Sequence, residues 1–315
     1  MNLAVGALAM GLLISLLALG VFVALRILHR TDLTADGAFG VGAAVGAAAL
    51  VRGLSPWTAA LLGLVAGMLA GVATGLIHTR LRTDMLLAGI LTSTALYSVI
   101  LYVMGGGDLS IVGRPTVFSI AEGVWHRTVG EAPDVEFLGT TVSAANCAAL
   151  ALLLVLVSAA AVVLDWLLRT RFGLAMRATG DNAQMARAQG VGVEGMVVLG
   201  LALANALAGF SGALFAQYQG FSNVQMGLGM LVTGLACVVI GEALVGRRRV
   251  RTHIGGVVAG AVLYRLLVAA ALRLGLDPNA LKLVTAVFVL AALVLPSVVR
   301  RGLARPWART GPRSV

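Results

Sequence analysis

The sequence predicts an all-α fold, a polytopic bundle of membrane-spanning helices that residues 1–315 form as a single domain. Only 11% of the residues are charged and 59% are hydrophobic, whereas soluble domains carry about 25% charged residues. The mean hydropathy is +0.98, which indicates that lipid surrounds most of the chain. The 40 glycines suit helices that pack backbone to backbone within a membrane.

Long apolar runs give the expected spans, because a helix needs about 20 residues to cross the hydrocarbon core. We expect about nine spans, within a range of eight to ten, at residues 3–25, 33–51, 56–78, 84–104, 141–168, 193–218, 224–246, 253–274 and 280–299. Two of these runs are rich in glycine and interrupted; one follows Asp32 and Asp36, and the other follows Asn223. They cross the membrane in opposite directions. This pattern favours broken helices within inverted repeats, which are common in transporters.

The basic residues orient the chain, because cytoplasmic loops carry an excess of Lys and Arg. With the N-terminus outside, 17 of the 23 basic residues fall on the inner side and 5 on the outer side, while Arg265 lies within a span. We therefore expect a multi-pass protein of the bacterial inner (plasma) membrane, with an outer loop at about 105–140 and a cytoplasmic tail at about 300–315. The net charge of +10 belongs to short loops beside the lipid bilayer and does not predict nucleic-acid binding.

The sequence lacks the patterns of catalytic and metal sites. Its single lysine, Lys282, lies in Asn-Ala-Leu-Lys-Leu-Val, without the glycines of a phosphate-binding P-loop. Cys147 and Cys237 lie within apolar runs, where cysteine behaves as a small hydrophobic residue. We expect no enzyme, no catalytic residue, no metal and no cofactor. ATP-driven function then requires a separate ATPase polypeptide.

A short helix is predicted in the inner loop at about 169–192. Asp181 and Gln184 have the spacing of a capping box at a helix N-terminus. Gly190 lies where a glycine ends a helix, and residues 182–189 between them are good helix formers. The loop therefore predicts a rigid helix of about two turns between two spans.

This helix is too short to be stable alone, so that contacts with another element or a partner must hold it. Arg177 and Arg187 lie beside it. One interpretation is a docking site for a partner protein. The other is an ordinary connector with basic residues that anchor it at the membrane surface.

Several segments resemble one family of transport proteins. Arg177–Val191 is similar to the coupling loop of permeases in the branched-chain amino acid and ribose branch of ABC importers, and Thr31–Phe39 is similar to their Asp-Leu-Ser-Val-Gly-type segment. The resemblance continues through Leu201–Gly209, Ala216–Gly220, Val239–Leu244, Leu263–Leu266 and Leu272–Asn279. It covers residues 12–296 approximately. It is closest to a subgroup associated with tryptophan- and tyrosine-type substrates, while residues 118–137 match no pattern of the family.

The resemblance implies the permease subunit of a binding-protein-dependent ABC importer, which moves an amino acid or a related compound, aromatic in this subgroup, into the cell. It implies three kinds of protein partner: cytoplasmic ABC ATPase subunits, an extracytoplasmic substrate-binding protein and a second permease copy in a homodimer. The residues that it assigns to ATPase coupling are Arg177, Gly180, Asp181, Asn182, Gln184, Arg187 and Gly190.

Polar residues within or beside the spans are candidates for the transport pathway or its gate. Asp32 and Asp36 open the second span, where carboxylates complement the positive end of a helix; they act either as helix caps or as gate residues. The other candidates are Ser93, Tyr97, Asn205 and Gln217. Hydroxyl and amide groups in spans also bond across helices as packing contacts, and the residues alone leave both roles open.

Arg265 is costly within hydrocarbon and requires a partner or water. We expect an intramembrane ion pair with Glu242, or else with Asp32 or Asp36. Binding of a substrate carboxylate is the alternative. Two other function classes also stay open: an ion-coupled secondary transporter, which needs carboxylate relays within the spans, and a channel, whose selectivity rings form only in an oligomer.

Overall fold

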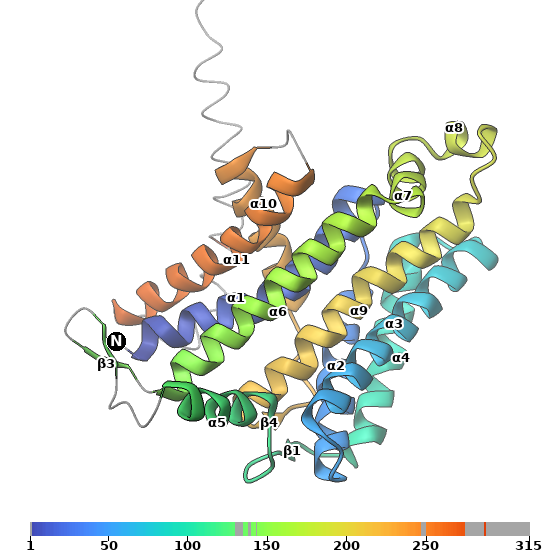
Figure 1. Ribbon diagram of the computed structural model, residues 1–315. Helices are drawn as coiled ribbons and strands as arrows, with labels where there is room; N and C mark the ends of the chain where they lie inside the picture. The colour runs from blue at the N-terminus through green and yellow to red at the C-terminus, as the bar shows by residue number, and fades with distance from the viewer. Residues whose placement is uncertain are drawn as a thin grey trace, which may run out of the picture.

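The computed structural model describes residues 2–129, 135–137, 140–142, 144–246, 250–274 and 287. It is an all-α bundle (Figure 1), as predicted. Its helices are α1 (Asn2–Phe22), continued by the π-helical turn η1 (Val23–Ile27), then α2 (Thr34–Val51), α3 (Pro56–Arg80), α4 (Met85–Met104), α5 (Val117–Val129), α6 (Ala144–Arg169), α7 (Arg171–Asp181), α8 (Ala183–Ala188), α9 (Val193–Gln219), α10 (Met230–Val245) and α11 (Val250–Arg273). Seven helices in the described residues are long and apolar enough to cross a membrane.

Four short strands complete the described elements. Strands β1 (Leu109–Ser110) and β4 (Phe221–Ser222) pair antiparallel, as do β2 (Val135–Phe137) and β3 (Thr140–Val142). Six of the predicted spans match α1–α4, α6 and α9, and the span at 253–274 matches α11. The span predicted at 224–246 is shorter, because α10 begins at Met230 and has 16 residues. The span predicted at 280–299 lies outside the described residues, apart from Val287.

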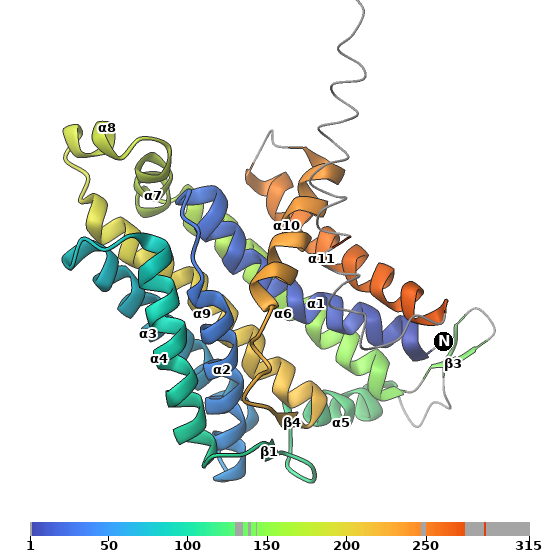
Figure 2. The same ribbon diagram turned by 180° about the vertical axis from the view of Figure 1, so that it is seen from behind.

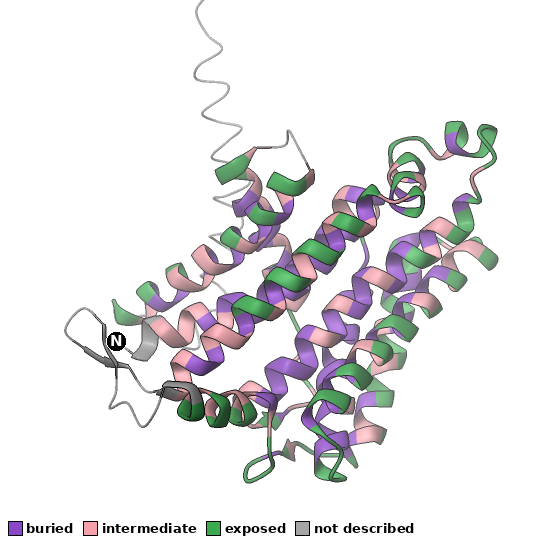
Figure 3. Cartoon of the chain, viewed as in Figure 1, coloured by how far each residue is buried: buried purple, intermediate pink, exposed green. Residues whose placement is uncertain are grey.

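Burial separates the central helices from the peripheral ones. The most apolar stretches of α1, α2 and α9 are 83%, 78% and 72% buried, whereas those of α3, α4 and α6 are 39%, 22% and 28% buried. Figure 3 shows the same division, with purple concentrated on the central helices. The apolar outer faces are suited to lipid or to another subunit, since their composition is as hydrophobic as that of the centre.

Glycine permits the closest approach within this centre. A Cβ atom on Gly42 of α2 would lie 2.5 Å from the Cα atom of Gly209 on α9, and one on Gly209 would lie 2.8 Å from the Cα atom of Gly67 on α3. Any larger residue at Gly209 would push these backbones apart. Small residues at helix crossings are the usual solution in membranes, where backbone contact replaces the hydrophobic driving force.

A non-helical linker precedes both α2 and α10, but α2 is one unbroken helix from Thr34 to Val51, so the interruption predicted within the span at 33–51 is absent. After η1, residues 28–33 leave the helix and return into the bundle before α2 begins, and residues 220–229 do the same between α9 and α10 (Figure 2). Helices from the first half of the chain pack against helices from the second half: α1 lies against α10 and α11, and α9 lies against α2 and α3. The inverted repeat stays a prediction from the sequence.

The two ends of the bundle differ in the elements they carry. One end, here called the α8 end, holds α7, α8, η1 and the start of α11 (Figure 1). The opposite end, the α5 end, holds α5, β1, β4 and the N-terminus of α1. The two linkers therefore enter the bundle from opposite ends.

Candidate functional site

Three predicted pathway residues line one cavity of about 400 Å³, here called the Asp36 pocket. Its walls come from α2, α4 and the linker that precedes α10. The polar residues are Asp36, Ser93, Thr94 and Tyr97, and the apolar and small ones are Leu33, Gly37, Gly40, Ile90, Ile100, Val224, Gly227 and Leu228. The cavity thus joins one carboxylate and three hydroxyl groups to apolar walls, a composition typical of small-solute sites.

Asp36 lies where two helices begin. It is in the first turn of α2, and its carboxylate accepts hydrogen bonds from the backbone N–H groups of Gly229 at 3.2 Å and Leu231 at 2.5 Å, at the start of α10. The first N–H groups of a helix lack partners within it, and the helix dipole favours negative charge there. Asp36 therefore caps α10 from another segment, since Gly229 has no side chain to do so.

Ser93 and Tyr97 lie one turn apart on α4. The hydroxyl group of Ser93 donates to the carbonyl oxygen of Leu33 at 2.8 Å, which ties α4 to the linker before α2. Tyr97 is 44% exposed and lies on the cavity wall. Ser93 thus has a packing role already, while Tyr97 offers its hydroxyl group to the cavity.

Asp32 and Asn205 form a buried pair away from the Asp36 pocket. They are 3% and 1% exposed. Asp32 accepts hydrogen bonds from the Thr34 backbone N–H at 2.8 Å and from Asn205 Nδ2 at 2.6 Å, and Asn205 Nδ2 also donates to the Leu201 carbonyl oxygen at 3.0 Å. The hydroxyl groups of Thr34 and Thr74 lie 2.7 Å apart. These bonds fix the start of α2 against α9 and α3, because a buried polar group left without a partner is costly.

Gln217 joins elements at the α5 end. It is 3% exposed. Its Nε2 donates to the Pro56 carbonyl oxygen at 3.2 Å, and its Oε1 accepts from the Val117 backbone N–H at 3.0 Å. Gln217 therefore links the first residue of α3 to the first residue of α5 through their backbone groups. The structure places Gln217 at this joint and outside the Asp36 pocket.

The predicted pairing of Arg265 with Glu242 does not match the contacts of the described residues. Glu242 pairs with Arg26: Arg26 Nη2 donates to Glu242 Oε2 at 2.7 Å, and Arg26 Nε lies 2.5 Å from Glu242 Oε1. Arg265 lies on α11 beside Gly11 of α1. The sequence prediction was misled because Arg26, which follows the first apolar run, looked like a loop residue. The π-helical turn η1 extends the helix through it.

The predicted coupling loop contains two helices where the sequence predicted one. The additional helix is α7, and α8 occupies the predicted segment. The predicted cap is displaced by one residue: Asn182 caps α8 by accepting the Met185 backbone N–H at 3.0 Å, while Asp181 ends α7. Gly190 has a φ of +81°, the left-handed conformation of a glycine that ends a helix.

The seven predicted coupling residues divide between the two helices. Arg177, Gly180 and Asp181 lie on α7. Arg177 and Gly180 are half-buried, and a Cβ atom on Gly180 would collide with the carbonyl oxygen of Ile27, whereas Asp181 is exposed. Asn182, Gln184, Arg187 and Gly190 lie on or beside α8 and are exposed. Figure 1 shows α8 projecting beyond the ends of the spans. The described residues hold no cluster of side chains suited to a metal ion.

Known proteins resemble this chain over most of its length. It is 32% identical over 282 residues to a tyrosine transport system permease protein of Clostridioides difficile, which covers 90% of this chain and 87% of that protein. It is 30% identical over 298 residues to an uncharacterised protein of Rickettsia prowazekii, covering 93% and 97% of the two chains. It is 29% identical over 258 residues to the autoinducer 2 import system permease protein LsrC of Yersinia pseudotuberculosis, covering 79% and 62%.

A solved structure and a protein family also match. The structure is described as a metal-chelate type ABC transporter in an inward-facing conformation; the TM-score is 0.48 at 16% sequence identity, over 95% of this chain and 85% of that one. Residues 3–294 match the family described as branched-chain amino acid transport system / permease component. The chain therefore belongs to this family of ABC transporter permeases.

Proposed function

We propose that the chain is the permease of an importer for an amino acid with an apolar or aromatic side chain, and that the solute passes the Asp36 pocket. The observation that carries this proposal is the single carboxylate of Asp36 among apolar walls, in a chain whose relative in Clostridioides difficile is a tyrosine transport permease. An ammonium group on the solute is the natural partner of a carboxylate at this depth. The apolar walls accept the side chain.

The α8 end faces the cytoplasm in this proposal. The sequence-based topology assigns 17 of the 23 basic residues to the cytoplasmic side, as the positive-inside rule requires, and Arg177 and Arg187 are among those that the structure describes at this end. ATP hydrolysis takes place in separate ABC ATPase subunits, which dock on α8. The N-terminus and α5 then face outward, toward an extracytoplasmic substrate-binding protein. A second copy of the chain completes the transporter as a homodimer, through the weakly buried outer helices.

The test uses the permease with its ATPase subunits and binding protein, reconstituted in lipid vesicles. We expect uptake of L-tyrosine, L-tryptophan or L-leucine that requires ATP. Replacing residues 182–190 by a Gly-Ser linker of equal length removes α8, and should abolish both ATPase binding and uptake. The control replaces residues 112–115, an exposed stretch at the α5 end, and should leave ATPase binding unchanged.

Two outcomes would contradict these proposals. If a well-folded preparation takes up solute without ATP, with an ion gradient as its energy source, the importer proposal fails and a secondary transporter takes its place. If ATP drives uptake but the α8 replacement still binds its ATPase with full affinity, the docking role of α8 is wrong.

A further inference from the structure

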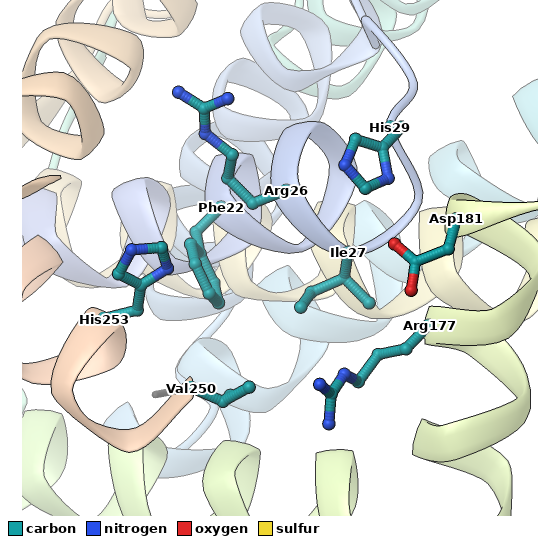
Figure 4. A pocket seen from close by; sticks show the side chains of 8 residues that line it. All are labelled: Phe22, Arg26, Ile27, His29, Arg177, Asp181, Val250 and His253. Atoms are coloured by element: carbon teal, nitrogen blue, oxygen red, sulfur yellow. The ribbon is translucent and has the colours of Figure 1, made fainter. Parts of the chain in front are cut away.

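A second cavity lies at the α8 end and shares no lining residue with the Asp36 pocket. Its volume is about 240 Å³. It lies between the end of α1 with η1, the helix α7 and the start of α11 (Figure 4). The residues that line it are Phe22, Arg26, Ile27, His29, Arg177, Asp181, Val250 and His253. We refer to it as the α7 pocket.

The α7 pocket presents opposite charges on one wall. Arg177 and Asp181 are four residues apart on α7, and both line the cavity. Within the described part of the chain, neither forms an ion pair with the other or with a third residue. Arg26 differs, because Glu242 already neutralises it. The cavity therefore offers one half-buried guanidinium group and one exposed carboxylate, neither within ion-pair distance of another charged group of the described residues, and this arrangement matches a zwitterion.

The opposite wall is apolar and aromatic. Phe22 and Ile27 are buried, and Val250 lies across from them at the start of α11. The rings of Phe22 and His253 meet edge to face, with centroids 5.8 Å apart. The volume is below the range of about 300–1,000 Å³ that drug-sized ligands occupy. A single amino acid is small enough for this volume. Its carboxylate would face Arg177, its ammonium group Asp181 and its side chain Phe22.

We propose that the α7 pocket binds a free amino acid on the cytoplasmic side and that the bound amino acid slows the transport cycle. This inference rests on the proposed function, because the ligand is of the class that the permease transports. The pocket lies where three segments meet: α7 precedes α8 directly, Gly180 of α7 touches the backbone of η1, and Val250 begins α11. Movement of α8 by the ATPase would reach the bundle through this joint.

A ligand that bridges α7, η1 and α11 stabilises one arrangement of these segments. A ligand shifts a conformational equilibrium only by its different affinity for the two states, and one that contacts both sides of a joint has such a difference. His29, which lines the pocket, has a φ of +52°, a strained conformation for a residue other than glycine. The imported amino acid, once it accumulates in the cytoplasm, would bind this pocket, hold the three segments in one arrangement and so reduce further import.

The test measures ATP hydrolysis by the complete transporter in lipid nanodiscs, with the binding protein saturated with its substrate. Excess L-tyrosine, L-tryptophan or L-leucine, whichever is transported, should inhibit hydrolysis. The N-acetyl derivative lacks the ammonium group and the amide derivative lacks the carboxylate. Each should require about tenfold or more higher concentration, since loss of one charged hydrogen bond weakens binding by about that factor.

Variants locate the inhibition in the α7 pocket. Arg177→Gln and Asp181→Asn should raise the half-inhibiting concentration about tenfold or more. The matched control is Arg171→Gln, an exposed residue of the same helix that does not line the cavity, and it should leave inhibition unchanged. Val250→Trp fills the cavity from α11 without altering either charge, so that it should abolish inhibition even if the α7 variants disturb coupling.

The outcomes separate this inference from the proposed function. If ATP drives uptake of an amino acid but no transported amino acid inhibits hydrolysis, the α7 pocket proposal is wrong and the importer proposal stands. Inhibition that survives Val250→Trp, or that N-acetyl and amide derivatives reproduce at equal concentration, also overturns it. If no amino acid is taken up with ATP, the proposed function itself fails.

Discussion

The two interrupted segments of the chain have the same plan but are fixed in different ways. Both α2 and α10 begin inside the bundle after a non-helical linker (Figure 2). The start of α2 is held by buried polar contacts, through Asp32 to Asn205 and through Thr34 to Thr74. The start of α10 receives the carboxylate of Asp36 and has no side-chain cap of its own.

This difference indicates which segment moves. A buried hydrogen-bonded network is costly to break, because each separated group loses its partner without gaining water. The N–H groups bonded to Asp36 belong to Gly229 and Leu231, just after the linker residues that line the pocket, and they can exchange the carboxylate for water when the linker moves. We infer that α2 stays with α9 and α3 during transport, whereas α10 moves together with the linker before it and so opens and closes the pocket.

The largest expected effect on stability is at the start of α2. Asn205→Leu leaves the buried Asp32 carboxylate without its amide donor, and should lower the free energy of unfolding by about 3 kcal/mol. Thermal unfolding in detergent measures this loss. The control is Thr94→Val, because the Thr94 hydroxyl is exposed and bonds only to the Ile90 carbonyl oxygen of its own helix. Equal stability of the two variants would show that α2 is not held by this network.

A smaller effect on stability but a large one on transport is expected at Asp36. Asp36→Asn keeps the shape of the side chain and removes its charge, so that unfolding should change by only about 1 kcal/mol. Uptake should fall about tenfold or more, since the solute loses its charged partner. Asp165→Asn is the control, a carboxylate that pairs with Arg169 of its own helix α6 and does not line the Asp36 pocket. Normal uptake by Asp36→Asn would remove this residue from the pathway.

The contact between α7 and η1 is tested by a substitution at Gly180. Gly180→Ala places a methyl group against the Ile27 carbonyl oxygen, which should separate α7 from η1 and lower the uptake per ATP hydrolysed by about a factor of three to ten. Gly195→Ala is the matched control, since a Cβ atom there meets nothing within 4 Å. An unchanged ratio for Gly180→Ala would mean that the α7–η1 contact does not transmit movement.

The smallest effect concerns the cap of α8. Asn182→Ala removes the side chain that accepts the Met185 N–H, and loss of such a cap costs about 1 kcal/mol. Affinity for the ATPase subunits should fall about fivefold, as measured by titration of the labelled ATPase. Gln184→Ala is the control: the sequence predicted Gln184 as part of the cap, whereas no hydrogen bond to its side chain occurs among the described contacts. If Gln184→Ala lowers the affinity more than Asn182→Ala does, the assignment of the α8 cap to Asn182 is wrong.

Hydropathy predicted most of the fold because span length and apolar composition are properties of local sequence. It located α1–α4, α6, α9 and α11, but α2 is continuous where an interruption was expected. The capping pattern located α8 to within one residue. It missed α7 although Thr170 caps that helix by accepting the Gly173 N–H, because the cap follows directly on the end of α6 and only the later Asp181 pattern was considered.

The candidate site could be predicted only in part. Asp36, Ser93 and Tyr97 were chosen for polarity within spans, and they do share a cavity. Asn205 and Gln217 met the same criterion but lie in buried joints, because polarity alone does not distinguish a lining residue from a packing contact. The partner of Glu242 depended on η1, a π-helical turn that no pattern in the sequence indicated, so Arg26 was passed over for Arg265.

The central claim, that α10 moves while α2 stays fixed, is tested most directly by distances between spin labels. Cys147 and Cys237 are replaced by alanine, and labels are placed at exposed Val51 of α2 paired with Leu199 of α9 or with Leu244 of α10. Electron–electron resonance then compares the complete transporter with and without trapped ATP. We predict an unchanged distance from Val51 to Leu199 and a changed distance from Val51 to Leu244. A change in the first distance with none in the second would contradict the account.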